Sequence, residues 1–262
     1  MARRRLILVP PSEGKALGGE GPPWLASDGA ADHPLHDQRL EVSAALSRQV
    51  ASARSVESLL GVSGEALQRA VDADSTIDSA PTLPAIERYD GVLYQHLDAA
   101  SMTPGQRRRL ARSLRIISGL WGVVAPDELI PDYRLKMSAS LDGIGKLSTW
   151  WRPFVSALLA SEARGAELWD LLPLEHSAAF DPPPRRTRNR AVFLSPNRSG
   201  ELVPVSHWNK ALKGALVSHL VRNPSAGPED LVDWEHPAGY RLDPDSLVVS
   251  DRVRVLRFVA DA

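Results

Sequence analysis

The sequence predicts an α/β or α+β fold in which helices surround a mixed β-sheet. Short apolar runs of strand length, such as residues 6–9 and 168–172, alternate with longer segments in which apolar residues recur at helical spacing. Strands and helices interleave without a strict βαβ repeat, which favours a mixed sheet. With 262 residues, 43% of them hydrophobic, the chain is long enough to bury a substantial core, and we expect one domain over residues 1–262.

Individual elements can be placed from apolar periodicity and from residues that start or stop helices. The predicted strands are residues 6–9, 133–137, 168–172, 239–242 and 253–259, with a β-hairpin formed by 191–194 and 202–205. The predicted helices are residues 41–53, 55–73 with a break at Gly61, 103–118, 147–163 and 206–222. Thr103 and Pro104 are a favourable helix start, because threonine accepts hydrogen bonds at the N-cap and proline fits the first turn. Ser206 is the expected cap of the last helix.

The composition excludes several kinds of protein and site. The absence of cysteine rules out disulfides, thiolate nucleophiles and cysteine-based metal centres. No apolar run reaches the roughly 20 residues that a transmembrane helix needs. The apolar run at residues 6–9 is also too short for a secretory signal. We therefore expect a cytoplasmic location and no membrane partner.

Seven segments occur in an order and spacing typical of one known family. They are LILVPPSEGK (6–15), YDGVLYQHLD (89–98), LRIISGLWGVVAPDELIPDYRLKM (114–137), GKLSTWW (145–151), LLPLEH (171–176), VSHWNKALKGALVSHLVRN (205–223) and GYRLDPD (239–245). Together they resemble the YaaA (DUF328) peroxide-stress family over essentially the whole chain, and residues 114–137 are the most specific match. The chain departs from the family pattern at Lys136, Asp170, His176 and Lys213.

The resemblance implies several properties that the composition does not show. It implies a family-specific YaaA-like fold with a helix-hairpin-helix-like element. It also implies a role in the oxidative stress response to hydrogen peroxide, limitation of iron damage, and DNA binding.

The loop after the first predicted strand is a candidate anion site. Lys15 follows Gly14 at a position where a loop can present backbone N–H groups, an ammonium and the hydroxyl of Ser12 to an anion. The loop is not a phosphate-binding Walker loop, because it lacks the required first glycine and has Ala16 in place of Ser or Thr. The alternative is a surface lysine paired with a carboxylate.

Three further cations extend this candidate site. Arg134 lies in an apolar context and therefore needs a partner, either a carboxylate such as Glu175 or Asp90 or a bound phosphate or carboxylate. Lys210 and Lys213 are three residues apart and share one face of a predicted helix. They either bind an anion or form a solvated basic face. The arginines of residues 106–115 are mostly expected to point outward.

Acid-base candidates complete the hypothesis. Lys15, Asp90 and Glu175 are the candidate catalytic groups, and Tyr94 is a further candidate for ligand contact or proton transfer. The alternative is a network of salt bridges. We expect Lys15, Asp90 and Glu175, together with Arg134 and Lys210, to meet in one pocket for a small anionic or nucleobase-containing substrate. Whether the protein is an enzyme stays open, and no cofactor is expected.

Residues 58–71 offer a different function. Gly61, Ser63 and Gly64 form a glycine-containing turn between two predicted helices, and Arg69 follows on the second helix. Such a turn can present N–H groups to the phosphates of double-stranded DNA without reading its sequence. The alternative is an ordinary pair of packed helices.

The segment DHPLHD at residues 32–37 is a weak metal candidate. His33 and His36 lie in a proline-containing loop with two flanking aspartates, and neither a third nor a fourth ligand is evident. No metal site is predicted.

Overall fold

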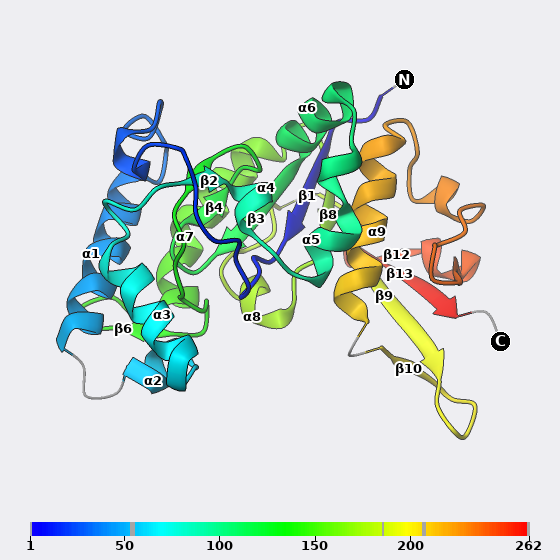
Figure 1. Cartoon of the computed structure of the whole chain (residues 1–262). Helices are drawn as coiled ribbons and strands as arrows, with labels where there is room; N and C mark the ends of the chain where they lie inside the picture. Colours follow the sequence, from blue (N-terminus) through cyan, green and yellow to red (C-terminus); the bar gives the residue numbers. More distant parts are fainter. Residues whose placement is uncertain (1, 53–55, 185, 206–207, 261–262) are drawn as a thin grey trace.

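The structure is a computed structural model that describes residues 2–52, 56–184, 186–205 and 208–260 (Figure 1). Within these residues, nine strands form the main sheet in the order β11-β13-β9-β8-β1-β3-β4, with β10 beside β9 and β12 beside β13. The strands are β1 (Arg5–Val9), β3 (Leu114–Ser118), β4 (Gly122–Val124), β8 (Glu167–Asp170), β9 (Arg188–Pro196), β10 (Leu202–Pro204), β11 (Tyr240–Leu242), β12 (Val249–Ser250) and β13 (Val253–Ala260). Strands β3, β1, β8, β9 and β13 run parallel, and the remaining pairings are antiparallel. The predicted α/β class with a mixed sheet is confirmed.

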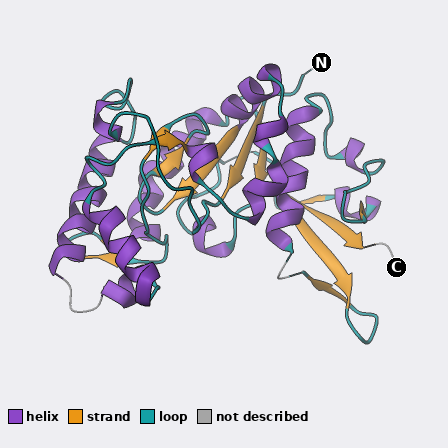
Figure 2. Ribbon diagram, in the orientation of Figure 1, coloured by secondary structure: helices purple, strands orange, loops and turns teal. Residues whose placement is uncertain are grey.

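Helices surround the sheet and build a second region beside it (Figure 2). They are α1 (His36–Ser52), α2 (Val56–Leu60), α3 (Gly64–Ser75), α4 (Ala85–Arg88), α5 (Val92–Leu97), α6 (Pro104–Ser113), α7 (Leu147–Glu162), α8 (Leu174–Ser177) and α9 (Asn209–Arg222). Two small antiparallel pairs, β2 (Leu83–Pro84) with β5 (Leu129–Ile130) and β6 (Ser140–Leu141) with β7 (Gly145–Lys146), lie outside the main sheet. None of the described helices is long and apolar enough to cross a membrane.

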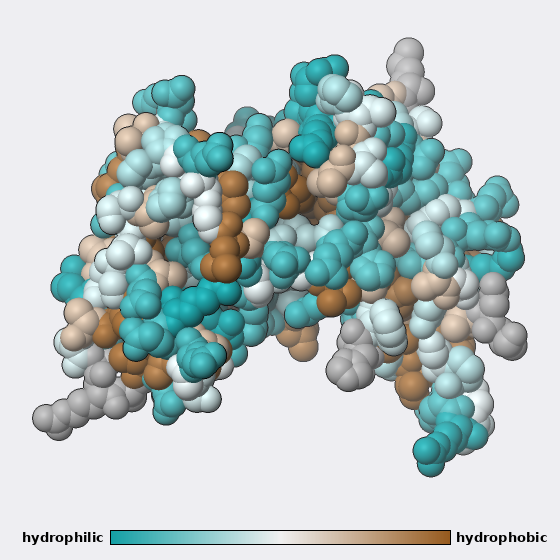
Figure 3. Space-filling model, viewed as in Figure 1, coloured by the Kyte–Doolittle hydropathy of each residue, from teal (hydrophilic) through white to brown (hydrophobic). Residues whose placement is uncertain are grey.

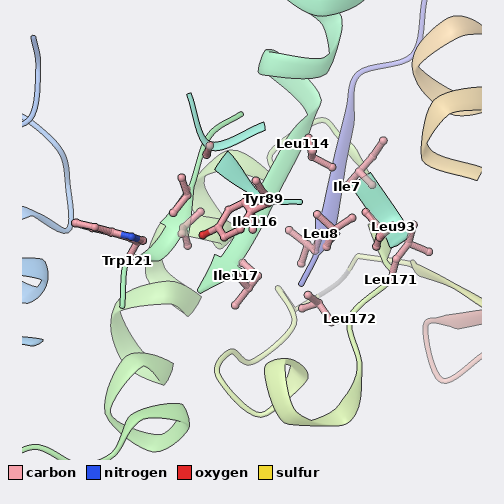
Figure 4. Packing of buried hydrophobic residues seen from close by; sticks show 14 of the residues in the cluster. Ile7, Leu8, Tyr89, Leu93, Leu114, Ile116, Ile117, Trp121, Leu171 and Leu172 are labelled. Atoms are coloured by element: carbon pink, nitrogen blue, oxygen red, sulfur yellow. The ribbon is translucent and has the colours of Figure 1, made fainter. Parts of the chain in front are cut away.

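Strand β1 is the centre of the core. All five of its residues are buried, as expected for a parallel strand covered on both faces. Its pairing places Val9 opposite Ile116 of β3, and Ile7 opposite Trp169 of β8. Apolar side chains from these strands and from the segment after β8 pack together (Figure 4). The position of β1 fixes where the loop that follows it emerges.

Close contact between α5 and α9 requires a glycine. A Cβ atom at Gly214 of α9 would lie 2.2 Å from the carbonyl oxygen of Leu93 in α5. The two helices lie side by side against the sheet (Figure 1). Gly214 therefore accommodates another backbone, not a ligand.

Several predicted elements are confirmed with small changes of boundary. Thr103 caps α6 in a reciprocal capping box with Gln106. Strands β9 and β10 form the predicted hairpin, and β8, β11 and β13 lie where apolar runs predicted them. Ser206, the predicted cap of the last helix, lies outside the described residues.

Two predictions of secondary structure are wrong. The helix predicted to reach Ser118 ends at Ser113, and the next five residues form β3, because Ile116 and Ile117 pack in the sheet beside β1. Residues 133–137 are not a strand. The backbone amide of Arg134 donates to the carboxyl group of Asp74 and not to a neighbouring strand.

Candidate functional site

The sheet changes its direction of winding between β1 and β8. The chain passes from β1 to β3 on one side of β1, and from β8 to β9 on the other. In open α/β sheets, ligands bind outside the carboxyl ends of the strands at such a switch point. The loop that contains Lys15 follows β1, and the segment that contains Glu175 follows β8, so both reach this location.

A cavity of about 240 Å³ lies there, and we call it the Lys15 cavity. Its polar and charged lining residues are Ser12, Glu13, Lys15, Tyr133, Arg134, Lys136, Glu175, His176 and Lys210. Four of the five side chains that the sequence predicted to converge therefore line one cavity. A second hollow of about 160 Å³ shares Glu13, Lys15 and Arg134 with it and adds Arg69 and Asp132.

Lys15 is held in an unusual environment for a lysine. Its side chain is buried, and the ammonium donates to the backbone oxygen of Ser12 at 3.2 Å. The same nitrogen lies 4.1 Å from the ring centroid of Tyr133, a cation–π distance. Burial lowers the pKa of Lys15 to about 8, although Asp132 and Asp74 oppose this shift. The amine therefore exchanges its proton near neutral pH.

Asp74 is a candidate residue that the sequence did not indicate. It lies in α3 and is completely buried, and one carboxyl oxygen accepts from the amide of Arg134 at 2.7 Å. The other oxygen has no hydrogen-bond partner among the described residues. Burial raises the pKa of Asp74 to about 8, against the opposing effects of the Arg134 amide and Lys15. Only its burial, which no local pattern reveals, distinguishes it from a surface aspartate.

The partner of Arg134 is Glu13, not the predicted Glu175 or Asp90. The guanidinium and the Glu13 carboxylate are 2.7 Å apart, and the guanidinium also donates to the backbone oxygen of Leu60 at 3.2 Å. Partial burial alone would raise the pKa of Glu13, but Arg134 and Lys136 lower it below its usual value. Arg134 therefore connects the loop after β1 to the end of α2.

A buried hydroxyl network supports the wall beside Lys15. The hydroxyl of Tyr133 lies 2.7 Å from those of both Tyr89 and Ser118. Burial raises the pKa of both tyrosines, so both are neutral phenols. The network holds the Tyr133 ring against Lys15, and sequence reasoning did not identify it.

The opposite wall of the cavity comes from α8 and the start of α9. The Glu175 carboxylate accepts from the amide of Ser138 at 2.9 Å. Burial lowers the pKa of His176 to about 4, despite the nearby Glu175. In the described structure its Nδ1 atom is buried without a hydrogen-bond partner. Lys210 adds an exposed ammonium at the cavity margin.

Three predicted residues, Asp90, Tyr94 and Lys213, lie outside the Lys15 cavity. Because Asp90 is one of them, the hypothesis of a pocket shared by Lys15 and Asp90 is wrong. Asp90 lines a separate hollow with Tyr94. The Asp90 carboxylate accepts from Gln95, and only its backbone oxygen faces Ser12. The hydroxyl of Tyr94 is buried and donates to the backbone oxygen of Pro10.

Lys213 is also separated from Lys210, although both lie on α9. Its ammonium donates to the backbone oxygen of Leu171 at 3.0 Å. Burial lowers the pKa of Lys213 to about 8, whereas the nearby buried Asp170 acts in the opposite direction. Asp170 also pairs with Arg188 at 3.2 Å. Lys213 therefore belongs to an ion cluster between α9 and the sheet, and not to the Lys15 cavity.

The predicted DNA-binding segment forms two helices, α2 and α3, joined by a turn. Gly61 and Gly64 have φ angles of +63° and +58°, which glycine adopts without strain, and Ser63 is exposed between them. Arg69 is not free, because its guanidinium bonds to Asp132 at 2.9 Å and to the backbone oxygen of Lys15 at 3.1 Å. The segment thus packs against the Lys15 loop, and its binding to DNA stays a prediction.

The possible metal ligands among the described residues are histidine and acidic side chains. Across the described residues, no group of three or more is arranged to hold a metal ion. Within the DHPLHD segment, the Nδ1 atom of His33 accepts from the amide of Leu35. Burial lowers the pKa of His33 to about 4.

Comparison with known proteins decides the family. A family model described as peroxide stress protein YaaA matches residues 6–246. The chain belongs to this family. The match includes both walls of the Lys15 cavity, and it confirms the resemblance seen in the sequence motifs.

Relatives in several bacteria are named UPF0246 proteins. The chain is 36% identical over 252 residues to a UPF0246 protein of Streptomyces coelicolor, covering 92% of this chain and 93% of the relative. It is 33% identical over 221 residues to one of Corynebacterium efficiens, covering 84% and 86%. A relative in Corynebacterium glutamicum is 32% identical over 250 residues, covering 89% and 93%. The similarity therefore extends over nearly the full length of these YaaA-family proteins.

Proposed function

We propose that this YaaA-family protein binds a small anionic or nucleobase-containing compound in the Lys15 cavity and acts on it. The observation that carries the proposal is a buried ammonium at the switch point of the sheet. Lys15 is only 8% exposed, yet it lines a cavity that other basic side chains surround. Enzymes place amines in such surroundings to hold an anion or to move a proton.

The charge around the cavity favours an anion. Its described lining contains the basic groups of Lys15, Arg134, Lys136 and Lys210 and the carboxylates of Glu13 and Glu175. Because Glu13 is already paired with Arg134, Lys15 and Lys210 are the cations best placed for a ligand. The unpartnered Nδ1 atom of His176 offers a hydrogen bond in the same wall.

Lys15 is the proposed proton-transfer group. A lysine whose pKa is about 8 is partly neutral at physiological pH, which a general base requires. Glu175 is the proposed second group, because the Ser138 amide fixes its carboxylate at the opposite wall. Asp90 has no part in this proposal, since it faces another hollow.

Calorimetric titration of the full chain with inorganic phosphate and with AMP tests the proposal. Lys15→Met should weaken binding on the order of 10- to 100-fold, because a hydrogen bond to a charged group contributes about 1.5–3 kcal/mol. Lys146→Met is the matched control, because Lys146 is exposed on β7 and does not line the cavity. Absence of binding by the unmodified protein, or equal binding by Lys15→Met, would refute the proposal. Unfolding of Lys15→Met would identify a structural lysine instead.

DNA binding through the α2–α3 turn is a second proposal, and it accompanies the proposed limitation of peroxide and iron damage. It is favoured by the two positive-φ glycines, Gly61 and Gly64, on an exposed turn. Glu57 and Glu65 flank this turn and oppose it, because carboxylates repel phosphates. The geometry therefore supports the Lys15 cavity better.

Fluorescence anisotropy with a labelled DNA duplex at low salt tests the second proposal. Ser63→Glu should abolish binding if the turn contacts phosphate. Ser75→Glu adds the same charge at the far end of α3 and should leave affinity unchanged. Equal effects of the two changes, or no binding at low salt, would contradict a role for the turn.

A further inference from the structure

Another cavity lies at the amino ends of the parallel strands, opposite the Lys15 cavity, and we call it the arginine cavity. Its volume is about 420 Å³. Six arginines from three segments line it: Arg3, Arg4, Arg5, Arg109, Arg112 and Arg115. The segment before β1, the end of α6 and the start of β3 meet there with the carboxyl end of α9, near the N-terminus in Figure 1. The surface over α6 is strongly hydrophilic (Figure 3).

Three of these arginines have a structural reason to be present. Arg5 is buried and donates to the backbone oxygens of Leu220, Asn223 and Ala226, while Arg109 donates to that of Val221. The last carbonyls of a helix lack partners within the helix, so these guanidiniums cap α9. In the same way, Arg115 donates to the backbone oxygen of Ala111 and pairs with Glu162 at 2.9 Å.

The other three arginines are not explained by capping. Arg3, Arg4 and Arg112 are exposed. Arg3 donates from Nε to the backbone oxygen of Ser225 at 3.1 Å and pairs with Glu167 at 3.3 Å, and Arg4 makes one long hydrogen bond of 3.4 Å to the backbone oxygen of Glu162. Arg112 has neither a hydrogen bond nor an ion pair to any described residue. Most of their N–H donors are therefore available at the cavity.

One of the inner arginines, Arg5, also has a donor without a partner among the described residues. The Nε atom of Arg5, a side chain that is only 5% exposed, is buried without a hydrogen-bond partner in the described structure. A buried charged donor without a partner is costly, and this residue lines the cavity. The cavity thus combines an inner layer of fixed guanidiniums with an outer layer of exposed ones.

We propose that the arginine cavity binds the phosphate chain of a di- or triphosphate. Six guanidiniums line the cavity, whereas the acidic groups that the described structure places near them are Glu162, Glu167 and Asp230, so the excess charge suits a ligand with several negative charges. Guanidinium groups form paired hydrogen bonds to phosphate oxygens. The described lining contains no aromatic ring, so it lacks the stacking surface with which proteins usually bind single-stranded nucleic acid. The ligand is therefore recognised through its phosphates.

Calorimetric titration of the full chain with inorganic triphosphate, and separately with ATP, tests this inference. The double change Arg4→Gln and Arg112→Gln should weaken triphosphate binding at least tenfold. Both side chains are exposed, so the melting temperature should not change. Arg108→Gln is the matched control, because Arg108 is exposed on the same helix and does not line the cavity. Lys15→Met should also leave this binding unchanged, which separates the inference from the proposed function.

The two ligands distinguish the source of the phosphate chain. Equal affinity for triphosphate and ATP indicates that the chain alone is recognised, whereas tighter ATP binding indicates a nucleotide. The inference is wrong if the unmodified protein binds neither ligand, or if sulfate at equal concentration displaces triphosphate. It is also wrong if Arg108→Gln weakens binding as much as the double change, or if duplex DNA binds through the same arginines when triphosphate does not.

Discussion

The two cavities lie at opposite ends of the same strands and use positive charge in opposite ways. In the Lys15 cavity basic and acidic side chains are mixed, and one ammonium, that of Lys15, is buried beside the rings of Tyr89 and Tyr133. In the arginine cavity all the charged lining residues are arginines, and half of them are exposed. The Lys15 cavity thus adjusts the pKa of one amine, whereas the arginine cavity attracts negative charge.

Burial explains the difference in chemistry. Desolvation disfavours the ammonium of Lys15, so small changes in its surroundings alter its protonation near neutral pH. Arginine keeps its charge under almost any conditions, so the second cavity cannot take part in proton transfer.

The largest effect is expected from the pH dependence of stability at Asp74. Burial raises the pKa of Asp74 from about 4 to about 8. The contribution of its neutral carboxyl group to the free energy of unfolding is therefore fully present below pH 4 and is lost as the pH rises through 8. Asp74→Asn keeps an acceptor for the Arg134 amide and removes the titration. The free energy of unfolding, measured with urea between pH 4 and 9, should fall by an amount on the order of several kcal/mol in the unmodified protein. Asp74→Asn should lack this fall. Parallel curves for the two proteins would contradict the assignment.

Arginines in the two cavities should differ in their effect on stability. Arg134→Met removes a half-buried guanidinium from Glu13 and from the Leu60 carbonyl, and should cost about 2 kcal/mol, less than a fully buried pair because Glu13 is 61% exposed. Arg112→Met removes an exposed side chain and should cost less than about 0.5 kcal/mol. Chemical denaturation measures both values. Similar losses of stability in the two variants would contradict the expected difference between a half-buried and an exposed arginine.

Ligand affinity at the Lys15 cavity should fall as the pH rises. A lysine with a pKa of about 8 is mostly charged at pH 7 and mostly neutral at pH 9, so affinity for an anion should fall roughly tenfold over this range. Titration with AMP at both pH values measures the change. Triphosphate affinity at the arginine cavity should stay within about twofold over the same range, because guanidinium does not titrate there. A constant AMP affinity would mean that Lys15 does not contact the anion.

The smallest expected effect is a difference in salt dependence. Raising the salt from about 50 to 200 mM should weaken triphosphate binding several-fold, because exposed charges are strongly screened. AMP binding in the Lys15 cavity should change by less than about threefold, since a buried ammonium is screened less. Equal salt sensitivity would indicate that AMP is held at the surface.

The sequence determined the family, the class of fold and much of the Lys15 cavity. Its motifs follow the strand ends, and Lys15, Arg134, Glu175 and Lys210 do line one cavity. Apolar runs also located β1, β8 and the β9–β10 hairpin, because strand burial leaves a direct signature in composition.

Only the tertiary structure decided which charged groups are buried and what they face. Asp90 also lies in a family-like segment, but its side chain lines a separate hollow, and Asp74 is buried without any local signal in the sequence. Residues 114–118 were also predicted to be helical, but they form a strand because they pair with β1. Burial and partner choice depend on contacts between segments distant in sequence, and those contacts set the pKa values on which the proposed chemistry rests.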